Sequence, residues 1–150
     1  MALSDVGFSR TRQANSNNDV FMLDPKQGGG IFAFRIDNGE RLWFTPPPGC
    51  GDRRPCSPAQ SQAVSGIPGT VFSGSMDGHL RAYSTEEGKL LWDYDTARDF
   101  VTINAVRGAG GSLDAGGPVI AGGMLFVGSG YGQWGGMPGN VLLAFSPDGR

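Results

Sequence analysis

The chain has 150 residues, of which 26 are glycine and 10 are proline, about twice the combined share of these two residues in average proteins. Charged residues make up 17% and the formal net charge is −2, which argues against a basic nucleic-acid surface and a polybasic membrane face. Nine Phe, three Trp and three Tyr supply the apolar area for a core and exclude solvated disorder. No apolar run approaches the ~20 residues of a membrane helix. These features predict a turn-rich, all-β chain.

The first 28 residues or so are expected to form an irregular N-terminal segment. The chain becomes polar within a few residues of its start and lacks the apolar centre of a signal peptide, so we expect no export signal in this stretch. Two strands are expected next, at Ile31–Ile36 and Arg41–Thr45, joined by a tight turn that contains Gly39.

The following loop, Pro46–Gln62, contains both cysteines, Cys50 and Cys56. Two cysteines this close can form a disulfide in an oxidising compartment, and we predict that they do. In a reducing compartment they would be free thiols. A zinc site is not expected, because the two cysteines and the distant His79 are one ligand short of the usual four.

Two further units alternate short apolar strands with glycine turns. In the first of them we expect strands at Ala63–Ser65, Thr70–Gly74, Leu80–Ser84 and Lys89–Tyr94. In the second we expect strands at Pro118–Ala121, Met124–Gly128 and Val141–Ser146.

The units repeat with a period of about 50 residues. An offset of 49 residues pairs Gly39 with Gly88 and Trp43 with Trp92, and Val141–Gly149 begins a third copy. Four-stranded units at this spacing are typical of β-propeller blades. The sequence therefore predicts about two and a half blades of a larger ring. Their expected ranges are about 29–45, 62–96 and 117–150.

The repeat, an Ala-aromatic pair followed by Gly-[Glu/Lys]-x-Leu-Trp, resembles the tryptophan-docking repeat of pyrroloquinoline quinone (PQQ) β-propellers. Among these, the chain is similar to quinoprotein alcohol dehydrogenases of the polyvinyl-alcohol dehydrogenase type, over about residues 28–149. The resemblance implies a ring of about seven or eight blades. In this family the Trp of one blade stacks on the next blade near the repeat glycine. The resemblance therefore implies structural roles for Trp43, Trp92, Gly39 and Gly88.

Function is expected on the face where two kinds of connection meet: those from a fourth strand to the next first strand, and those from a second to a third strand. The long connections of these kinds are Pro46–Gln62, Asp95–Gly117 and Gly128–Gly139. PQQ is a tricarboxylate, which an arginine fork would suit. Arg107 is the candidate for this role.

Four other side chains on this face have alternative interpretations. Arg53 and Arg54 could also pair with carboxylates, or they form a solvated loop pair. Asn104 and Asp114 could ligate Ca²⁺, and Asp114 could accept the proton of a substrate alcohol as the catalytic base. Both could instead cap turns through bonds to the backbone.

Two aromatic residues, Tyr131 and Trp134, lie in the glycine-rich segment Gly128–Gly139. They offer flat apolar faces to a quinone or a polymer chain. The chain also departs from the resembled dehydrogenases, which carry two adjacent cysteines against the cofactor, whereas Cys50 and Cys56 are separated. Other ligands of that family are not matched either.

The resemblance implies part of a PQQ-dependent oxidoreductase that oxidises an alcohol or polymeric alcohol in the periplasm or outside the cell. It also implies Ca²⁺ as an assisting ion, the remaining blades as partners and cytochrome c as electron acceptor. The alternative is a cofactor-free propeller that serves as a protein-interaction scaffold, because outer-membrane assembly lipoproteins carry a similar repeat without PQQ. The long aromatic and arginine-bearing loops favour the enzyme, and the missing ligands favour the scaffold.

Overall fold

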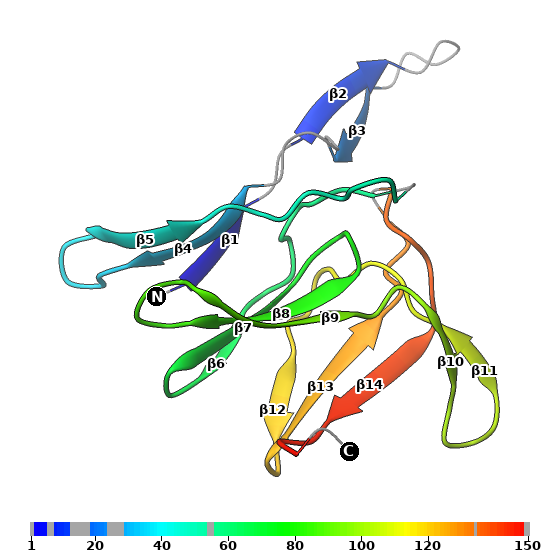
Figure 1. Cartoon of the computed structure of the whole chain (residues 1–150). Coiled ribbons are helices and arrows are strands. Elements are labelled where there is room, and N and C mark those ends of the chain that lie inside the picture. Colours follow the sequence, from blue (N-terminus) through cyan, green and yellow to red (C-terminus); the bar gives the residue numbers. More distant parts are fainter. Residues whose placement is uncertain are drawn as a thin grey trace.

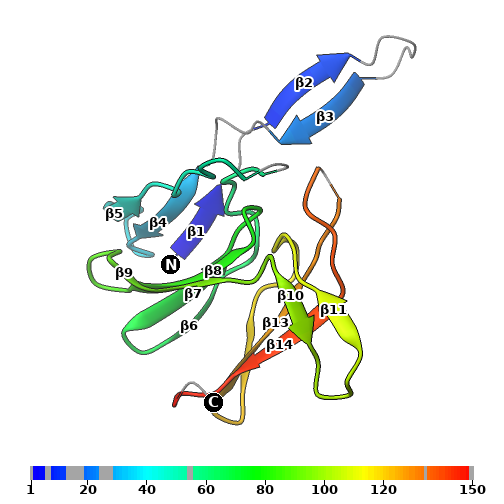
Figure 2. The ribbon, with the colours of Figure 1, turned by 45° about the vertical axis from the view of Figure 1, so that its right-hand side comes forward.

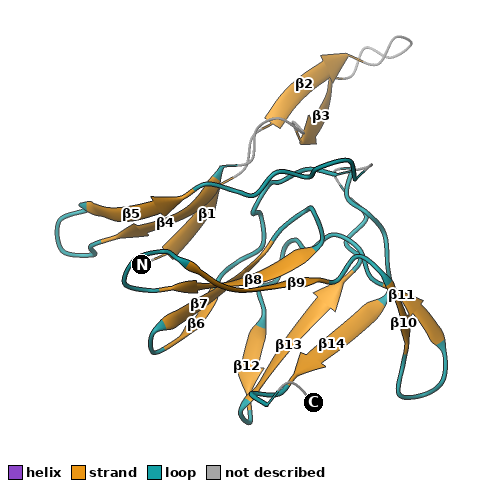
Figure 3. Cartoon of the chain, in the orientation of Figure 1, coloured by secondary structure: helices purple, strands orange, loops and turns teal. Residues whose placement is uncertain are grey.

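The computed structural model describes residues 2–5, 8–12, 19–23, 29–53, 56–133 and 135–148 (Figure 1). The described residues form fourteen strands in five antiparallel sheets and contain no helix (Figure 3). In this part of the chain there is accordingly no helix long and apolar enough to span a membrane. The prediction of an all-β fold is confirmed.

Three of the sheets follow one another along the chain. The first sheet has the order β1 (Ala2–Asp5), β4 (Gly30–Phe34), β5 (Arg41–Thr45). The second has the order β6 (Ser65–Ile67), β7 (Thr70–Gly74), β8 (His79–Ser84), β9 (Leu90–Asp95). The third has the order β12 (Val119–Ala121), β13 (Met124–Ser129), β14 (Val141–Phe145). These are the sheets of a partial β-propeller, and β1 lies outside the expected range of the first blade, about 29–45.

Three strands occupy part of the N-terminal region that we expected to be irregular. β1 pairs with β4 from Ala2↔Ala33 to Asp5↔Gly30, the position that β7 has beside β8 in the second sheet. The other two, β2 (Phe8–Arg12) and β3 (Asp19–Leu23), form a hairpin. This hairpin is therefore an insertion between the second and third strands of the first blade, and it projects away from the three sheets (Figure 2).

A second unexpected hairpin lies within the connection Asp95–Gly117, where we expected only a loop. It consists of β10 (Asp99–Val101) and β11 (Arg107–Ala109). Its turn contains Ala105, whose φ of 60° is uncommon for a residue with a side chain. The outer edge of β11 lies beside Asn140, whose N–H donates to the carbonyl of Ala109 at 2.7 Å. The hairpin is thereby fixed against the start of β14.

Successive sheets pack face to face through two apolar clusters. The cluster between the first and second sheets contains the buried residues Ile31, Val71 and Tyr83. The cluster between the second and third sheets contains the buried residues Leu80, Leu113, Leu125 and Val127. Burial of each aliphatic side chain stabilises the fold by roughly 1.5–3 kcal/mol. Strands β6 and β12 also contact each other, as expected for the innermost strands of neighbouring blades.

Trp43 docks on the turn of the next blade. Its indole Nε1 donates a hydrogen bond to the carbonyl of Thr85 at 3.0 Å, and Thr45 Oγ1 donates to the carbonyl of Gly88 at 2.6 Å. Gly88 has a φ of +68°, and a Cβ there would lie 2.5 Å from Trp43 Cε3. The turn therefore requires glycine both for its backbone conformation and for the space that the indole ring fills.

Trp92 is the corresponding residue of the second blade. It packs against the Leu-rich cluster between the second and third sheets and stacks on Tyr94, with ring centroids 5.7 Å apart. Phe145 meets it edge-on at 5.3 Å. Gly149, the glycine of the corresponding turn, lies outside the described residues. Trp92 is thus placed in the core between two blades.

Cys50 and Cys56 form a disulfide, with their Cα atoms 6.1 Å apart. The predicted pairing is confirmed. The bond closes a short ring in the connection between the first and second blades, and Arg53 lies within this ring.

Candidate functional site

The connections expected to share one face are held together by hydrogen bonds. Thr96, just after β9, donates its N–H to the carbonyl of Gly78 at 2.8 Å, and its hydroxyl lies 2.7 Å from Ser129 Oγ. Farther along, Ser112 N–H donates to the carbonyl of Met137 at 2.9 Å. The connection Asp95–Gly117 therefore packs both on the turn between β7 and β8 and on the segment Gly128–Gly139.

A buried ion pair lies beneath this face. Arg81 on β8 donates from Nη2 to Asp77 Oδ2 at 2.6 Å, and the two side chains are 3% and 4% exposed. The guanidinium also donates to Ser75 Oγ at 2.7 Å and to Asp93 Oδ2 at 3.1 Å. Burial alone would lower the pKa of Arg81, but its hydrogen bond to Asp77 and the nearby negative charges raise it. The guanidinium therefore forms these hydrogen bonds within its own blade.

Arg53 is bound to the protein and is not a solvated loop residue. It forks onto Asp95, with Nη1 donating to Oδ1 at 3.0 Å and Nη2 to Oδ2 at 2.5 Å. Its Nη1 also donates to the carbonyl of Asp77 at 2.8 Å. The hydrogen bond to Asp95 raises the pKa of Arg53 despite partial burial. The expected pairing with a carboxylate occurs, but the carboxylate belongs to this chain; Arg54 lies outside the described residues.

Because of the Asp95 carboxylate, we expect the free energy of unfolding to depend on pH. Burial would raise the pKa of Asp95, but hydrogen bonds from Arg53 and from Ala97 N–H lower it below the ordinary value. Because the folded-state pKa is depressed, its stabilisation is fully present above about pH 4, the unfolded pKa, and is lost as pH falls through the folded pKa. With the side chain 38% exposed, screening limits the effect to about 0.5 kcal/mol.

We expect the unfolding free energies of the full-length protein and its Asp95→Asn variant, measured in urea from about pH 7 to about pH 2, to converge below about pH 4. A difference that stays constant over this range would contradict the assignment.

His79 lies against a carboxylate. Its Nδ1 is 2.6 Å from Asp93 Oδ1, and its Nε2 is 3.9 Å from Asp95 Oδ1. The sequence analysis did not predict this cluster of charged side chains, although the sequence contained one signal of it. Arg81 lies between two apolar residues of a strand, and a charge in a buried strand requires a partner.

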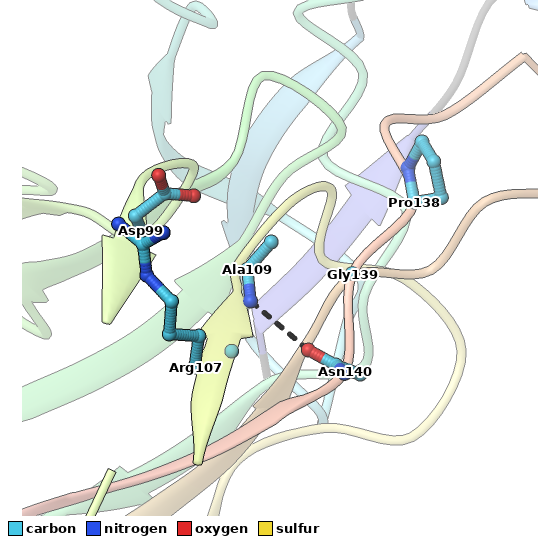
Figure 4. Close-up of a pocket in the computed structure, with 7 residues that line it drawn as sticks. Asp99, Arg107, Ala109, Pro138, Gly139 and Asn140 are labelled. Atoms are coloured by element: carbon cyan, nitrogen blue, oxygen red, sulfur yellow. Dashed lines mark hydrogen bonds between the residues drawn. The ribbon is translucent and has the colours of Figure 1, made fainter. Parts of the chain in front are cut away.

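Arg107 lines an open groove of about 490 Å³ on the outer part of the same face (Figure 4). Its side chain is exposed on β11, and Asp99 on the neighbouring strand lines the same groove. Asn140 forms the opposite wall, where its Oδ1 accepts a hydrogen bond from Ala109 N–H at 2.9 Å. The other lining residues are Gly108, Pro138 and Gly139.

The remaining predicted residues do not line this groove. Asn104 lies in the turn of the β10–β11 hairpin, where its Oδ1 accepts a hydrogen bond from the Thr102 hydroxyl. Asp114 is half-buried in the connection leading into β12, and Tyr131 is half-buried with its N–H donated to the carbonyl of Ser112 at 2.9 Å. Trp134 lies outside the described residues. The candidates therefore do not form one cluster in the part of the chain that the structure describes.

A family model of the PQQ_2 type, described as outer membrane protein assembly factor BamB, matches residues 27–149. The chain belongs to the PQQ-repeat family. The crystal structure of BamB from Moraxella catarrhalis superposes on 90% of the chain and 36% of that structure with a TM-score of 0.55. At 20% identity, this likeness shows the propeller fold alone.

Three curated relatives of this PQQ-repeat chain are named as alcohol dehydrogenases. It is 46% identical over 143 residues to a polyvinylalcohol dehydrogenase of a Pseudomonas species, covering 83% of the chain and 22% of the relative. It is 43% identical over 135 residues to the enzyme of that name from Sphingopyxis sp. (strain 113P3), covering 81% and 21%. A 1-butanol dehydrogenase (cytochrome c) from Thauera butanivorans is 28% identical over 107 residues, covering 70% and 14%. The chain spans about a fifth of the length of the first two relatives.

The Arg107 groove of this PQQ-repeat chain does not fit the family's cofactor. PQQ is a flat tricarboxylate that needs cations for its carboxylates and a flat wall for its rings. The groove offers one guanidinium together with the carboxylate of Asp99, and none of its lining residues is aromatic. Among the described residues no group of three or more His, Cys, Asp or Glu side chains is arranged to hold a metal ion.

Proposed function

We propose that this chain forms part of a PQQ-dependent dehydrogenase that oxidises an alcohol, and in particular a polymeric alcohol. The observation that carries the proposal is the identity of 46% and 43% to two polyvinylalcohol dehydrogenases over more than four fifths of the chain. In this proposal the PQQ site is built outside the Arg107 groove, with the remaining blades of the propeller. Tyr131 and Trp134 stay candidates for contact with its rings.

Two further parts of the proposal concern the surroundings of the enzyme. A relative whose name includes cytochrome c supports a cytochrome c as electron acceptor. The disulfide between Cys50 and Cys56 supports a periplasmic or secreted location, because disulfides persist in oxidising compartments.

Asp114 is the proposed catalytic base. It lies in the connection into β12, a strand that contacts β6 of the neighbouring blade and is therefore near the propeller axis. A half-buried carboxylate at that position can accept the hydroxyl proton of an alcohol as hydride or electrons leave its carbon.

The test uses the full-length protein with PQQ and Ca²⁺. We expect saturable PQQ binding, measured by the quenching of tryptophan fluorescence. We also expect oxidation of secondary alcohols. Asp114→Asn should lower kcat by about 10²–10⁴-fold while PQQ affinity stays within about twofold. Asp37→Asn, a change at an exposed aspartate in the turn between β4 and β5, is the matched control and should leave both quantities unchanged. Full activity of Asp114→Asn would contradict the assigned base.

A cofactor-free scaffold is the second candidate. It is favoured by the match to a family described by BamB and by the poor fit of the Arg107 groove to PQQ. A folded full-length protein that binds no PQQ would support this candidate and overturn the enzyme.

A further inference from the structure

The Arg107 groove is built from three extended segments that lie side by side: β10, β11 and 138–140. In the hairpin, Asp99 pairs with Ala109 and Val101 pairs with Arg107. Residues directly opposite each other in an antiparallel pair point to the same face, so these four side chains share one surface. The third segment joins β11 through the hydrogen bonds of Asn140 with Ala109. Figure 4 shows Arg107, Ala109 and Asn140 beside one another on these segments.

The surface of the groove has no net charge. Asp99 contributes one carboxylate and Arg107 one guanidinium, and both are exposed. A charged ligand of either sign would meet a like charge as well as an opposite one, which lowers its net attraction. Both groups, together with the Asn140 amide, can still form hydrogen bonds with neutral hydroxyls.

The same hairpin exposes a group of apolar side chains. Val101 is 83% exposed, Val106 is 59% exposed, and Ile103 at the turn is fully exposed. Val106 is next to Arg107 in the chain and so points to the opposite face. Val101 and Ile103, two residues apart, remain as a pair of large exposed apolar side chains, which is more than the single exposed residues that are normal on a surface. Val101 lies on the same face as Asp99 and Arg107, so it extends the surface of the groove toward the turn.

A neutral polymer that alternates hydroxyl-bearing carbons with methylene groups matches both features. Its hydroxyls can pair with Asp99, Arg107 and Asn140, while its methylene groups can contact Val101 and Ala109. A single small alcohol would occupy only a minor part of a groove of about 490 Å³. The hairpin follows β9, the last strand of its blade, so the groove lies toward the outer rim, away from Asp114 and the inner strands.

We propose that the groove over β10, β11 and 138–140 is a distal binding site for the chain of a neutral polyhydroxylated polymer, of which polyvinyl alcohol is the probe. This proposal rests on the proposed function. The site would bind a segment of polymer remote from the carbinol being oxidised, and so would raise the affinity for long substrates without taking part in the chemistry.

The first measurement compares substrates of different length, using the full-length protein loaded with PQQ. For the double variant Val101→Ser/Ile103→Ser we expect KM for polyvinyl alcohol to rise by about tenfold while kcat, and KM for a short secondary diol such as 2,4-pentanediol, stay unchanged. Ile36→Ser, which alters an equally exposed side chain beyond β4, is the matched control. An unchanged polymer KM in the double variant would overturn the site.

The second measurement is independent of the cofactor. Native electrophoresis of the full-length protein without PQQ, in gels with and without soluble polyvinyl alcohol, should show retardation by the polymer. The double variant should lose this retardation and Ile36→Ser should keep it. If no alcohol is oxidised but the retardation and its loss persist, the proposed function fails and the polymer site stands. Retardation equal in all three proteins, or absent from all, would overturn the site.

Discussion

Replacing Gly88 by valine should destabilise the full-length protein by about 3 kcal/mol. A left-handed φ costs a residue with a side chain roughly 1–2 kcal/mol, and forcing atoms into a filled space costs a further 1–3 kcal/mol, roughly. Both penalties apply, because Gly88 has a φ of +68° and its Cβ would collide with the Trp43 ring. Urea unfolding followed by tryptophan fluorescence would measure the loss.

Gly39→Val is the matched control for this change. Gly39 has a φ of +73°, but no atom lies within 4 Å of a Cβ built there. Only the backbone penalty applies, so we expect a loss of about 1 kcal/mol. Equal losses at the two glycines would show that Trp43 does not dock on Gly88.

The second large effect is expected at the buried ion pair. Arg81→Met should cost about 3–5 kcal/mol, because it leaves the carboxylate of Asp77 buried without its main partner. Asp77 is 4% exposed, so water cannot replace the guanidinium. Thermal unfolding monitored by circular dichroism would show the loss as a fall in Tm.

Arg35→Met provides the comparison, since Arg35 forms an ion pair with Glu40 at 3.3 Å while both side chains are more than half exposed. Exposed pairs contribute less than about 1 kcal/mol. If Arg81→Met were as mild as Arg35→Met, the Arg81 guanidinium would not be the partner that stabilises Asp77.

The strands that sequence reasoning placed well are those whose pattern is local. β5 was predicted at its observed bounds, Arg41–Thr45, and β7 at Thr70–Gly74, because alternating side chains and a glycine turn define them within a few residues. β1 was missed because Ala2–Asp5 has little alternation and becomes a strand only through pairing with β4, about thirty residues away. The β10–β11 hairpin was missed because its apolar residues are exposed and its turn depends on Ala105 in a left-handed conformation.

The site was less predictable than the fold. Arg107 was predicted to bind a carboxylate of PQQ, and it lies in a groove that does not fit PQQ. Asp99 beside it was not predicted, because their proximity depends on the unexpected hairpin. The partner of Arg53 is Asp95, 42 residues away, and no spacing rule connects residues of different loops. Asn104 was predicted either to ligate Ca²⁺ or to cap a turn, and its contact with the Thr102 hydroxyl belongs to a hairpin that the sequence analysis did not predict.

The disulfide has a consequence for the strength of the Arg53 ion pair. A partly exposed pair between distant residues is weak chiefly because two long side chains and their loops must be immobilised to form it. Cys50 and Cys56 enclose Arg53 in a short covalent ring, so part of that entropic cost is already met before the guanidinium meets Asp95. The ring thus raises the effective concentration of the cation at the carboxylate. In a reducing environment the same residues would form a looser and shorter-lived contact.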